Sequence, residues 1–298
     1  MPALLAVGAA ILDLVYVLDE LPIIPQKYRA KSLSLQGGGM AATAAVTARR
    51  LGLEVALAAR VGDDAFGGAI VDELTKEGVD CALVRRWPGR HSAVSAVMIN
   101  SAGERMLVNY KDRDMESGTD WLPAKLPANI DGVLGDSHWE AGTSHFFRLA
   151  REAGKPAILD ADRWMVSRDI LTNATHIGFS ARALREYSGV ESLPEALMRF
   201  QMQLSGWLAV TDGENGARFM EDGGICHEPA FTVDAVETNG AGDVWHGALA
   251  VAILEGQEPR NAVRFANAAA SIKCSRLGGR GGIPTRNEIA ELLGNRLA

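Results

Sequence analysis

The sequence has 298 residues, of which 47% are hydrophobic and 22% charged, and its formal net charge is −7. This size and balance are typical of one large globular domain, and the negative charge argues against a nucleic-acid-binding protein. No stretch reaches the ~18 uninterrupted apolar residues of a membrane span. The apolar N-terminus has no Lys or Arg before Lys27, which argues against a signal peptide. With three scattered cysteines and no C-x-x-C pair, we expect a cytoplasmic protein with free thiols and no membrane or nucleic-acid partner.

Along most of the chain, short apolar runs alternate with longer helical patterns. We expect strands at 4–12, 54–62, 156–162, 176–180 and 206–213, and helices at 40–52, 64–78, 192–204 and 243–256. Gly52 and Gly78 end the first two helices at the position after the cap. This alternation predicts an α/β fold with a mostly parallel sheet covered by helices on both faces. Ligands in such a sheet bind beyond the carboxyl ends of the strands.

Two segments, 14–36 and 91–110, break this rhythm because polar and apolar residues alternate in them. The second has a Ser-Ala-Gly turn in its middle, which is typical of an antiparallel hairpin exposed on one face. We therefore expect a single domain, 1–298, with a small strand-built lid inserted at these two segments. A lid at the ligand edge would exclude water from the site.

The first glycine-rich stretch is "LQGGGMAATAAV", in which Gly37, Gly38 and Gly39 open a helix. Glycines there let the backbone approach a ligand with no Cβ in the way. The alternative is a plain turn into a tightly packed, alanine-rich helix. The spacing is not the G-x-G-x-x-G of a dinucleotide site, so an oxidoreductase is disfavoured.

A second stretch, "VTDGENGARF", places Thr211, Gly213 and Gly216 at the end of an expected strand. A turn of this kind at the end of a strand could pass beside a bound nucleotide. A simple hairpin turn explains the same residues. No Walker pattern occurs in the chain, which excludes a P-loop NTPase at the motif level.

The third stretch, "ETNGAGDVWHGALAVAI", places Asp243 directly after a Gly-Ala-Gly turn and before an apolar helix. Helix N-termini attract anions through free N–H groups and the macrodipole, so a carboxylate at this point needs a reason. Asp243 is either the N-cap of the helix, a position that Asp favours, or a chemical group placed beside a bound anion.

Together the "GGG…A" segment, "RVGDDAFG", the "TDGENG" turn and "ETNGAGD" resemble the PfkB, or ribokinase-like, carbohydrate kinases over essentially the whole chain. The resemblance implies a three-layer sandwich with a mostly parallel central sheet and a small β-strand lid. It also implies transfer of the γ-phosphoryl group of ATP to a sugar hydroxyl, with Mg²⁺, in a homodimer that forms through the lid.

The resemblance also answers the question of Asp243. In this family the aspartate of the GAGD motif is the general base for the acceptor hydroxyl, and the N–H groups of Gly240, Ala241 and Gly242 form the anion hole. Phosphoryl transfer depends mostly on positioning and charge stabilisation. An ordinary carboxylate that is ionised at pH 7 suffices if it touches the hydroxyl.

Further roles carry over from the resemblance position by position. Asp13 matches the acceptor of sugar hydroxyls, although it could simply end a strand, and Gly38 and Gly39 match the sugar-facing backbone. The positions that match the nucleotide site are Thr211, Gly213, Gly216, Asn267, Ala270 and Ser271. The last three lie in an alanine-rich helix that plain core packing would also explain.

Within the family, the chain is most similar to the 6-deoxy-6-sulfofructose kinases, on "QKYRAK", "GERMLVNY", "NGAGDVWHGALAVA" and "GGRGGIP". This similarity implies phosphorylation of the C1 hydroxyl of a 6-substituted ketohexose, with Lys27, Asn109 and His138 at the anionic group. His138 stands where an Arg is expected and is a poorer anion partner. Lys27 could instead be a solvated lid residue. The alternatives are fructose 6-phosphate, another sugar or nucleoside, or a non-catalytic sugar- or nucleotide-binding protein.

Several positions depart from the family pattern. Glu237 replaces the usual Asp that opens the motif, and Ala42 stands where ribose-type members carry an Asn, which disfavours ribose. The N-x-x-E motif that helps to organise Mg²⁺ is replaced by Ser180 and Ala183. The metal ligands are therefore unknown, and the ion would be held mainly by substrate phosphates and a carboxylate elsewhere. The six histidines form no zinc-ligand pattern.

Overall fold

The computed structural model describes residues 1–115, 117–165 and 167–294. Its strands are β1 (Ala3–Gly8), β2 (Ile11–Val17), β3 (Ser32–Gly38), β4 (Glu54–Gly62), β5 (Asp80–Trp87), β6 (Val94–Ile99), β7 (Arg105–Tyr110), β8 (Gly132–Asp136), β9 (Ala157–Ala161), β10 (His176–Ser180), β11 (Trp207–Thr211), β12 (Ala217–Glu221) and β13 (Gly224–Glu228). Its helices are α1 (Met40–Arg50), α2 (Ala65–Lys76), α3 (Glu140–Glu152), α4 (Arg168–Asn173), α5 (Ala181–Ser188), α6 (Leu193–Gln201), α7 (Ala241–Leu254), α8 (Pro259–Cys274) and α9 (Arg286–Gly294), with short 3₁₀ helices η1 (Gly213–Asn215) and η2 (Gly279–Gly282).

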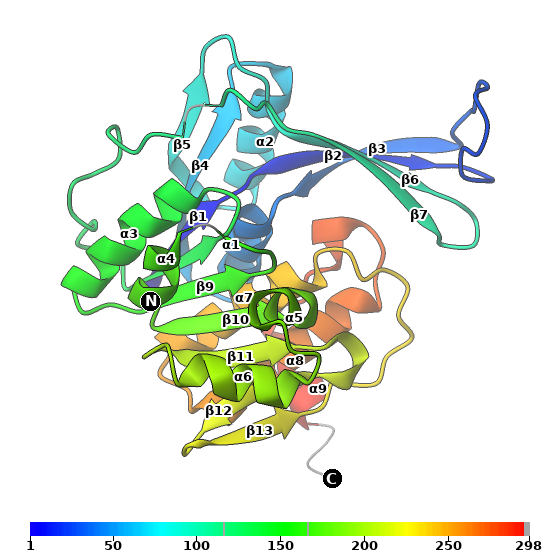
Figure 1. The fold of residues 1–298 in the computed structure, drawn as a ribbon. Coiled ribbons are helices and arrows are strands. Elements are labelled where there is room, and N and C mark those ends of the chain that lie inside the picture. The colour runs from blue at the N-terminus through cyan, green and yellow to red at the C-terminus, as the bar shows by residue number, and fades with distance from the viewer. Residues whose placement is uncertain (116, 166, 295–298) are drawn as a thin grey trace.

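A nine-stranded sheet forms the middle layer, in the order β13-β12-β11-β10-β9-β8-β1-β4-β5. The pairings from β11 to β5 are all parallel, and β12 and β13 extend the sheet as antiparallel strands. Side chains of α1, α2, α7, α8 and α9 pack on one face, and those of α3, α4, α5 and α6 pack on the other (Figure 1). The expected three-layer α/β architecture is thus confirmed.

Strand β1 shows why these runs contain only apolar residues. Leu4 and Ala6 belong to the core beneath α1 and α7, whereas Leu5 and Val7 belong to the core beneath α3. All four are fully buried. A parallel strand covered by helices on both faces loses the polar–apolar alternation of a half-exposed strand.

The single strand expected at 4–12 is wrong, because the chain leaves the large sheet after Gly8. Asp136, at the end of β8, accepts hydrogen bonds from the N–H groups of Ala9 (2.7 Å) and Ala41 (3.1 Å). A Cβ on Gly8, whose φ is 147°, would lie 2.1 Å from the Asp136 carboxyl carbon. The backbone is turned at this point, and the next strand, β2, joins another sheet.

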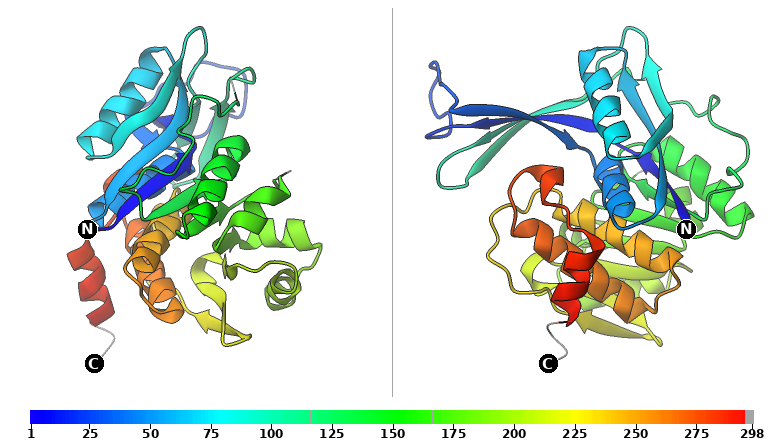
Figure 2. Two further views of the ribbon diagram at one scale, coloured as in Figure 1. Left: turned by 90° about the vertical axis from the view of Figure 1, so that its left-hand side faces the viewer. Right: turned by 180° about the vertical axis from the view of Figure 1, so that it is seen from behind.

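The second sheet, which we call the lid, has the strand order β3-β2-β6-β7. It projects from the body as a long ribbon (Figures 1 and 2). Residues 91–110 form the expected hairpin, with β6 and β7 antiparallel. Strand β2 pairs with β3 antiparallel and with β6 in parallel, so two hairpins lie side by side. The first lid segment extends from Ile11 to Gly38, wider than the expected 14–36, and 18–31 contributes no strand.

Candidate active site

Two pockets lie at the carboxyl-terminal edge of the large sheet. The lid pocket, of about 310 Å³, is lined by residues of the lid, the start of α1 and the turn before α7. The α8 pocket, of about 800 Å³, is lined by the η1 turn, residues of α8 and the start of α7. Strand β1, which ends beside the lid pocket, lies between β4 and β8, so the strand order reverses there. Such a reversal is the usual ligand site of an open α/β sheet.

Six of the seven residues that we predicted at the sugar line the lid pocket: Asp13, Gly38, Gly39, Asn109, His138 and Asp243. Asp13 pairs with Ser95 on β6, and Ser95 pairs with Asn109 on β7, so the three side chains form a row on one face of the lid. Lys27 does not line the pocket of its own chain; it is exposed in the segment 18–31. The roles of these residues stay predictions.

The three consecutive glycines are needed where they stand. A Cβ on Gly38 would lie 2.6 Å from an Asp13 carboxylate oxygen, and one on Gly39 would lie 2.5 Å from the carbonyl oxygen of Ala9. Gly39 also has a φ of 91°, which L side chains rarely adopt. The alanines that follow in α1 are buried. The turn into a tightly packed helix is therefore confirmed. The same backbone also lines the lid pocket, and its approach to a ligand stays a prediction.

Asp243 does not cap α7, so the capping alternative is wrong. It is the third residue of the helix, and the N-cap is Gly240, in the left-handed region with φ 76°. The N–H of Ala241 donates to the carbonyl of Thr238 at 3.2 Å. Because the first turn of a helix leaves N–H groups without intrahelical partners, Gly242 and Asp243 offer the amides for an anion at this helix end.

Burial sets the protonation of Asp243. Desolvation, reinforced by the charges of Asp162 and Asp136, raises the pKa of Asp243 to about 7, although Arg280 opposes the shift. The sequence predicts an ordinary carboxylate that is ionised at pH 7, and the raised pKa of Asp243 differs from this prediction. A carboxyl group with a pKa near neutrality is better suited to accept a proton than an acidic one, because it can gain and lose a proton at the working pH.

A buried histidine connects the turn at Gly242 to the sheet. The Nδ1 of His246 lies 2.9 Å from the carbonyl oxygen of Gly242 and 3.2 Å from an Asp160 carboxylate oxygen, and its Nε2 lies 3.1 Å from the carbonyl oxygen of Gly178. Burial raises the pKa of Asp160, and the nearby charge of Asp243 raises it further. These contacts hold the first turn of α7 against β9 and β10.

The α8 pocket contains every residue predicted for the nucleotide: Thr211, Gly213, Gly216, Asn267, Ala270 and Ser271. The first three belong to a turn between β11 and the antiparallel β12, so the hairpin explanation is confirmed, while their role at a nucleotide stays a prediction. The Oδ1 of Asn267 accepts from Trp245 Nε1 at 2.8 Å, and the Oγ of Ser271 accepts from the N–H of Phe231 at 3.3 Å. Because these polar atoms already have partners, Asn267 and Ser271 shape the wall of the pocket.

His138 has a partner that the sequence did not reveal. Its Nδ1 lies 2.8 Å from the Nζ of Lys111. Burial, followed by the charges of Lys111 and Arg163, lowers the pKa of His138 to about 4, so the ring is neutral and accepts the bond. The positive charge near this corner of the lid pocket therefore comes from Lys111 and Arg163, of which Lys111 contacts the His138 ring. The position of Lys111 two residues after Asn109, on the same side of an extended chain, is the signal that could have identified it.

Other residues of the lid pocket were missed, among them the polar or charged Thr43, Ser95, Asp162, Lys273 and Arg280. Two of them are buried cations, since Lys273 is 1% exposed and Arg280 is 4% exposed. The Nζ of Lys273 lies 3.2 Å from a Glu237 carboxylate oxygen, and the other Glu237 oxygen accepts from the N–H of Gly278 at 2.8 Å. Glu237, which replaces the usual Asp of the motif, thus connects Lys273 on α8 with the backbone at Gly278.

The positions of the missing N-x-x-E motif serve the fold. Ser180 is the N-cap of α5 and accepts from the N–H of Ala183 at 3.1 Å, and Ala183 is buried. Among residues 1–115, 117–165 and 167–294, no group of three His, Cys, Asp or Glu side chains is arranged to hold a metal ion. Within the same ranges, no helix is long and apolar enough to cross a membrane.

Comparison with known proteins agrees with this geometry. The pfkB family carbohydrate kinase pattern matches residues 1–286. The chain is 29% identical to a ribokinase of Bacillus subtilis, over 96% of this chain and 98% of that protein. It is 26% identical to an ATP-dependent ribose-1-phosphate kinase of Halopiger xanaduensis, over 99% of each. The crystal structure of a candidate ribokinase from Agrobacterium tumefaciens, 34% identical, superposes with a TM-score of 0.92 over 99% of this chain and 98% of that one. The chain belongs to the pfkB family of carbohydrate kinases and is a phosphotransferase.

Proposed function

We propose that this kinase transfers the γ-phosphoryl group of Mg·ATP, bound in the α8 pocket, to a sugar hydroxyl in the lid pocket. The turn at 238–243 carries the proposal because it forms a wall of both pockets. Thr238, Ala241 and Gly242 line the α8 pocket, whereas Gly240 and Asp243 line the lid pocket. A phosphoryl group passing between the pockets would meet the N-terminus of α7, where the amides and macrodipole stabilise negative charge.

The side chains of the lid pocket have different roles in the phosphoryl transfer. Asp243 accepts the proton of the acceptor hydroxyl, and its pKa of about 7 lets it do so near neutral pH. Asp13, Ser95 and Asn109 face the sugar from the lid and orient its hydroxyls. When bound together with the nucleotide, Mg²⁺ would neutralise charge on the phosphates. The lid above the sugar keeps water away, which prevents hydrolysis of ATP.

We infer that the acceptor is the C1 hydroxyl of a ketohexose with an anionic group at C6, such as 6-deoxy-6-sulfofructose. The supporting feature is the corner of the lid pocket that Asn109 and His138 line, where the ammonium of Lys111 contacts the His138 ring. The Halopiger relative is named for a phosphorylated sugar, which supports an anionic acceptor. Fructose 6-phosphate is the alternative acceptor.

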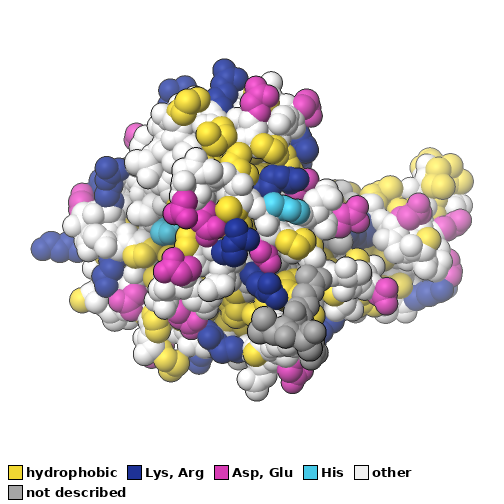
Figure 3. Space-filling view, turned by 90° about the horizontal axis from the view of Figure 1, so that it is seen from below, with side chains coloured by type: hydrophobic (Ala, Val, Ile, Leu, Met, Phe, Trp, Pro, Cys, Tyr) yellow, Lys and Arg dark blue, Asp and Glu magenta, His cyan; other side chains and the backbone are white. Residues whose placement is uncertain are grey.

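We further propose a homodimer that forms through the lid. On the lid face opposite Asp13 and Asn109, the strand register aligns two apolar rows: Leu33, Tyr16, Met98, Met106 and Leu35, Leu14, Ala96, Val108. Leu35 is 60% exposed and Val108 is 59% exposed. Figure 3 shows hydrophobic side chains on the projecting lid. A second copy of the same apolar face would cover these rows in a two-fold interface.

Such a dimer also offers a role for Lys27. This residue is exposed and does not line the lid pocket of its own chain. It belongs to the segment 18–31 between β2 and β3, which lies at the outer end of the lid (Figure 1). If two lids pack together, the segment 18–31 of one subunit extends toward the lid pocket of the other. We infer that Lys27 reaches the anionic group of a sugar bound by the partner subunit.

The acceptor is tested by measuring ADP release with 6-deoxy-6-sulfofructose, fructose 6-phosphate, tagatose 6-phosphate, fructose, ribose and adenosine. We expect the highest kcat/KM with an anionic ketose. A preference for neutral sugars would overturn the anionic acceptor and leave the kinase assignment intact. Asp243→Asn serves as the control for ADP release that does not depend on the transfer.

The role of Lys27 is tested by mixing two impaired variants, Lys27→Ala and Asp243→Asn, under conditions that exchange subunits, and by comparing the activity of the mixture with that of each variant alone. In the mixed dimer, the subunit with Asp243 receives Lys27 from its partner, so one complete site forms and activity returns. If Lys27 acts within its own chain, each subunit of the mixed dimer keeps one defect and the activity stays lost.

A further inference from the structure

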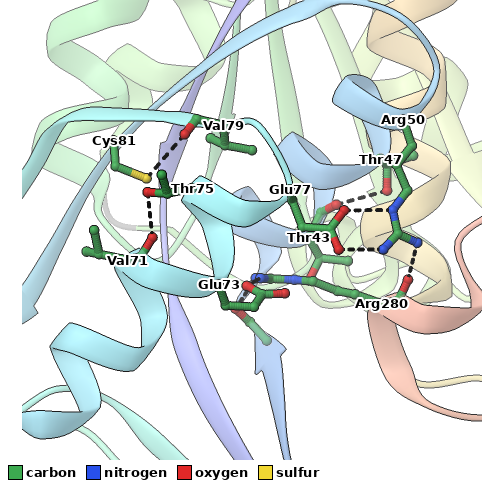
Figure 4. Close-up of polar contacts among 11 residues, drawn as sticks. Thr43, Thr47, Arg50, Val71, Glu73, Thr75, Glu77, Val79, Cys81 and Arg280 are labelled. Atoms are coloured by element: carbon green, nitrogen blue, oxygen red, sulfur yellow. Dashed lines mark hydrogen bonds and ion pairs between the residues drawn. The ribbon is translucent and has the colours of Figure 1, made fainter.

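Arg280 is a buried cation that the mechanism above does not use. It lies in η2, is 4% exposed and lines the lid pocket. Its Nε donates to the Oγ1 of Thr43 at 3.3 Å, and one terminal nitrogen donates to the carbonyl oxygen of Gly38 at 2.7 Å. The other terminal nitrogen pairs with the Glu73 carboxylate (Figure 4). One guanidinium thus joins α1, α2 and the last residue of β3.

The guanidinium also lies against the backbone of β3. A Cβ on Gly37 would lie 2.2 Å from a guanidinium nitrogen of Arg280, so a larger residue there would displace the guanidinium. The two residues before Arg280 make a second contact. The N–H groups of Gly278 and Gly279 donate to one Glu237 carboxylate oxygen, at 2.8 and 3.3 Å. Residues 278–280 therefore connect the turn before α7 with the end of the lid.

Arg280 also supplies positive charge to a pocket rich in carboxylates. The charged groups around Asp243 come from several elements: Asp13 on β2, Asp136 on β8, Asp160 on β9, Asp162 after β9, Lys273 on α8 and Arg280. Burial raises the pKa of Asp243 and of Asp13, and the guanidinium of Arg280 opposes both shifts. Loss of Arg280 would leave these acids with less compensation.

We propose that Arg280 is a positioning residue of this kinase, which fixes the Gly37–Gly38 end of the lid at the sugar and balances the charge of Asp243. The proposal rests on the assignment of the lid pocket as the sugar site. Arg280 acts through the backbone of β3 and through Asp243, and it takes no proton itself. The rigid fork of a guanidinium is needed because three acceptors on three elements are held at once.

The test compares Arg280→Lys and Arg280→Met with the control Arg50→Met. Arg50 holds the same C-terminal segment from outside the pocket. It donates to the carbonyl of Arg280 at 2.6 Å and makes two hydrogen bonds to Glu77, at 2.7 and 2.9 Å (Figure 4). A purely structural role of Arg280 would therefore be shared by Arg50, which does not line the lid pocket.

We expect Arg280→Met to raise the KM for the sugar about 10- to 100-fold, the usual range for one lost charged hydrogen bond, with little change in the KM for ATP. In the plot of kcat/KM against pH, the fall on the acidic side (the acid limb) should move to higher pH, because the pKa of Asp243 rises when the guanidinium is removed. Arg280→Lys should keep the position of the acid limb, since the charge remains, but not the low KM. Arg50→Met should lower Tm and leave both the sugar KM and the acid limb unchanged.

Two results would overturn the proposal: an unchanged sugar KM and acid limb in folded Arg280→Met, or the same changes in Arg50→Met. If Arg280→Met does not fold, Arg280→Lys still decides the case through its KM. Failure of the proposed function has a different signature. In that case Asp243→Asn would keep its activity, whatever the Arg280 variants do.

Discussion

The two pockets differ in how they are built. The α8 pocket is formed largely by one turn, one helix and the segment between them, and its predicted residues Thr211, Gly213 and Gly216 are close neighbours in the sequence. The lid pocket takes residues from β2, β3, β6, β7, α1, α7, α8 and η2. The residues of a pocket built from local motifs can be predicted from the sequence. When a pocket is assembled from distant segments, sequence motifs predict only some of its residues.

The difference extends to charge. The α8 pocket presents backbone, small side chains and polar groups that already have partners inside the protein. The lid pocket collects Asp13, Asp162 and Asp243 together with Lys273 and Arg280. Substitutions in the first should change binding through shape, and substitutions in the second should change binding and protonation together.

The largest effect is expected for Asp243→Asn, which removes the proposed general base from the lid pocket. Activity should fall by about 10²- to 10⁴-fold, the usual contribution of acid–base catalysis. Because burial raises the pKa of Asp243 to about 7, its contribution to stability is present at acidic pH and lost as the pH rises toward and through 7. The variant should therefore have a higher Tm than the natural protein at pH 8, and a smaller difference at pH 5. Near-normal turnover, measured as ADP release, would contradict the assignment.

The second-largest effect is expected for a substitution that fills the α8 pocket. Ala270 lines this pocket and is partly exposed, so Ala270→Phe should fill space that the nucleotide needs. We expect the KM for ATP to rise at least about fivefold, as overfilling of a packed site costs about 1–3 kcal/mol, and the KM for the sugar to stay within about twofold. Steady-state kinetics with each substrate varied in turn provide the check. An equal rise in both constants would mean that the pockets are not separate.

A smaller and more selective effect is expected for Lys111→Met. This change removes the ammonium beside His138 and keeps a similar length of side chain. The kcat/KM for a C6-anionic ketose should fall about tenfold, the value of one partly exposed charged contact, while that for fructose should change little. Lys125→Met, at a charged residue that lines neither pocket, is the matched control. Equal losses with both sugars would show that Lys111 has no role in selecting the anion.

The smallest effect concerns the polar row on the lid. Ser95→Ala removes one hydroxyl between Asp13 and Asn109. Because that hydroxyl helps to hold the pKa of Asp13 down against burial, its loss should make Asp13 more readily protonated. We expect the KM for the sugar to rise about three- to tenfold, as for one neutral hydrogen bond, mainly below neutral pH. A pH-independent change would indicate loss of packing alone.

Much of the fold could be predicted from the sequence because its signals are local. The strands at 54–62 and 176–180 have the expected bounds, and Gly52 and Gly78 follow the helices α1 and α2 with positive φ, as expected. The run at 4–12 misled because β1 and β2 are both apolar. The chain turns between them at the carboxylate of Asp136, which accepts hydrogen bonds from the N–H groups of Ala9 and Ala41, 127 and 95 residues away in the sequence.

The candidate site shows the same limit. Asp243 and the glycines before it were predicted because they share a short motif and a family resemblance. Arg280 and Lys273 could not be assigned, since a buried cation is identified by its partners, and Glu73, Gly38 and Glu237 lie on other elements. Lys27 was predicted at the sugar from its neighbours in the sequence, but the structure places it in the exposed segment 18–31.

The parallel pairing of β2 with β6 has a consequence for folding. These strands belong to the same sheet, yet α1, β4, α2 and β5 lie between them in the chain. Contacts between distant residues form slowly, because the intervening loop must be closed first. The lid should therefore assemble only after the body that joins its two hairpins. In the native state it should also open before the body does, so its amide hydrogens should exchange with solvent while those of β1 and β8 remain protected.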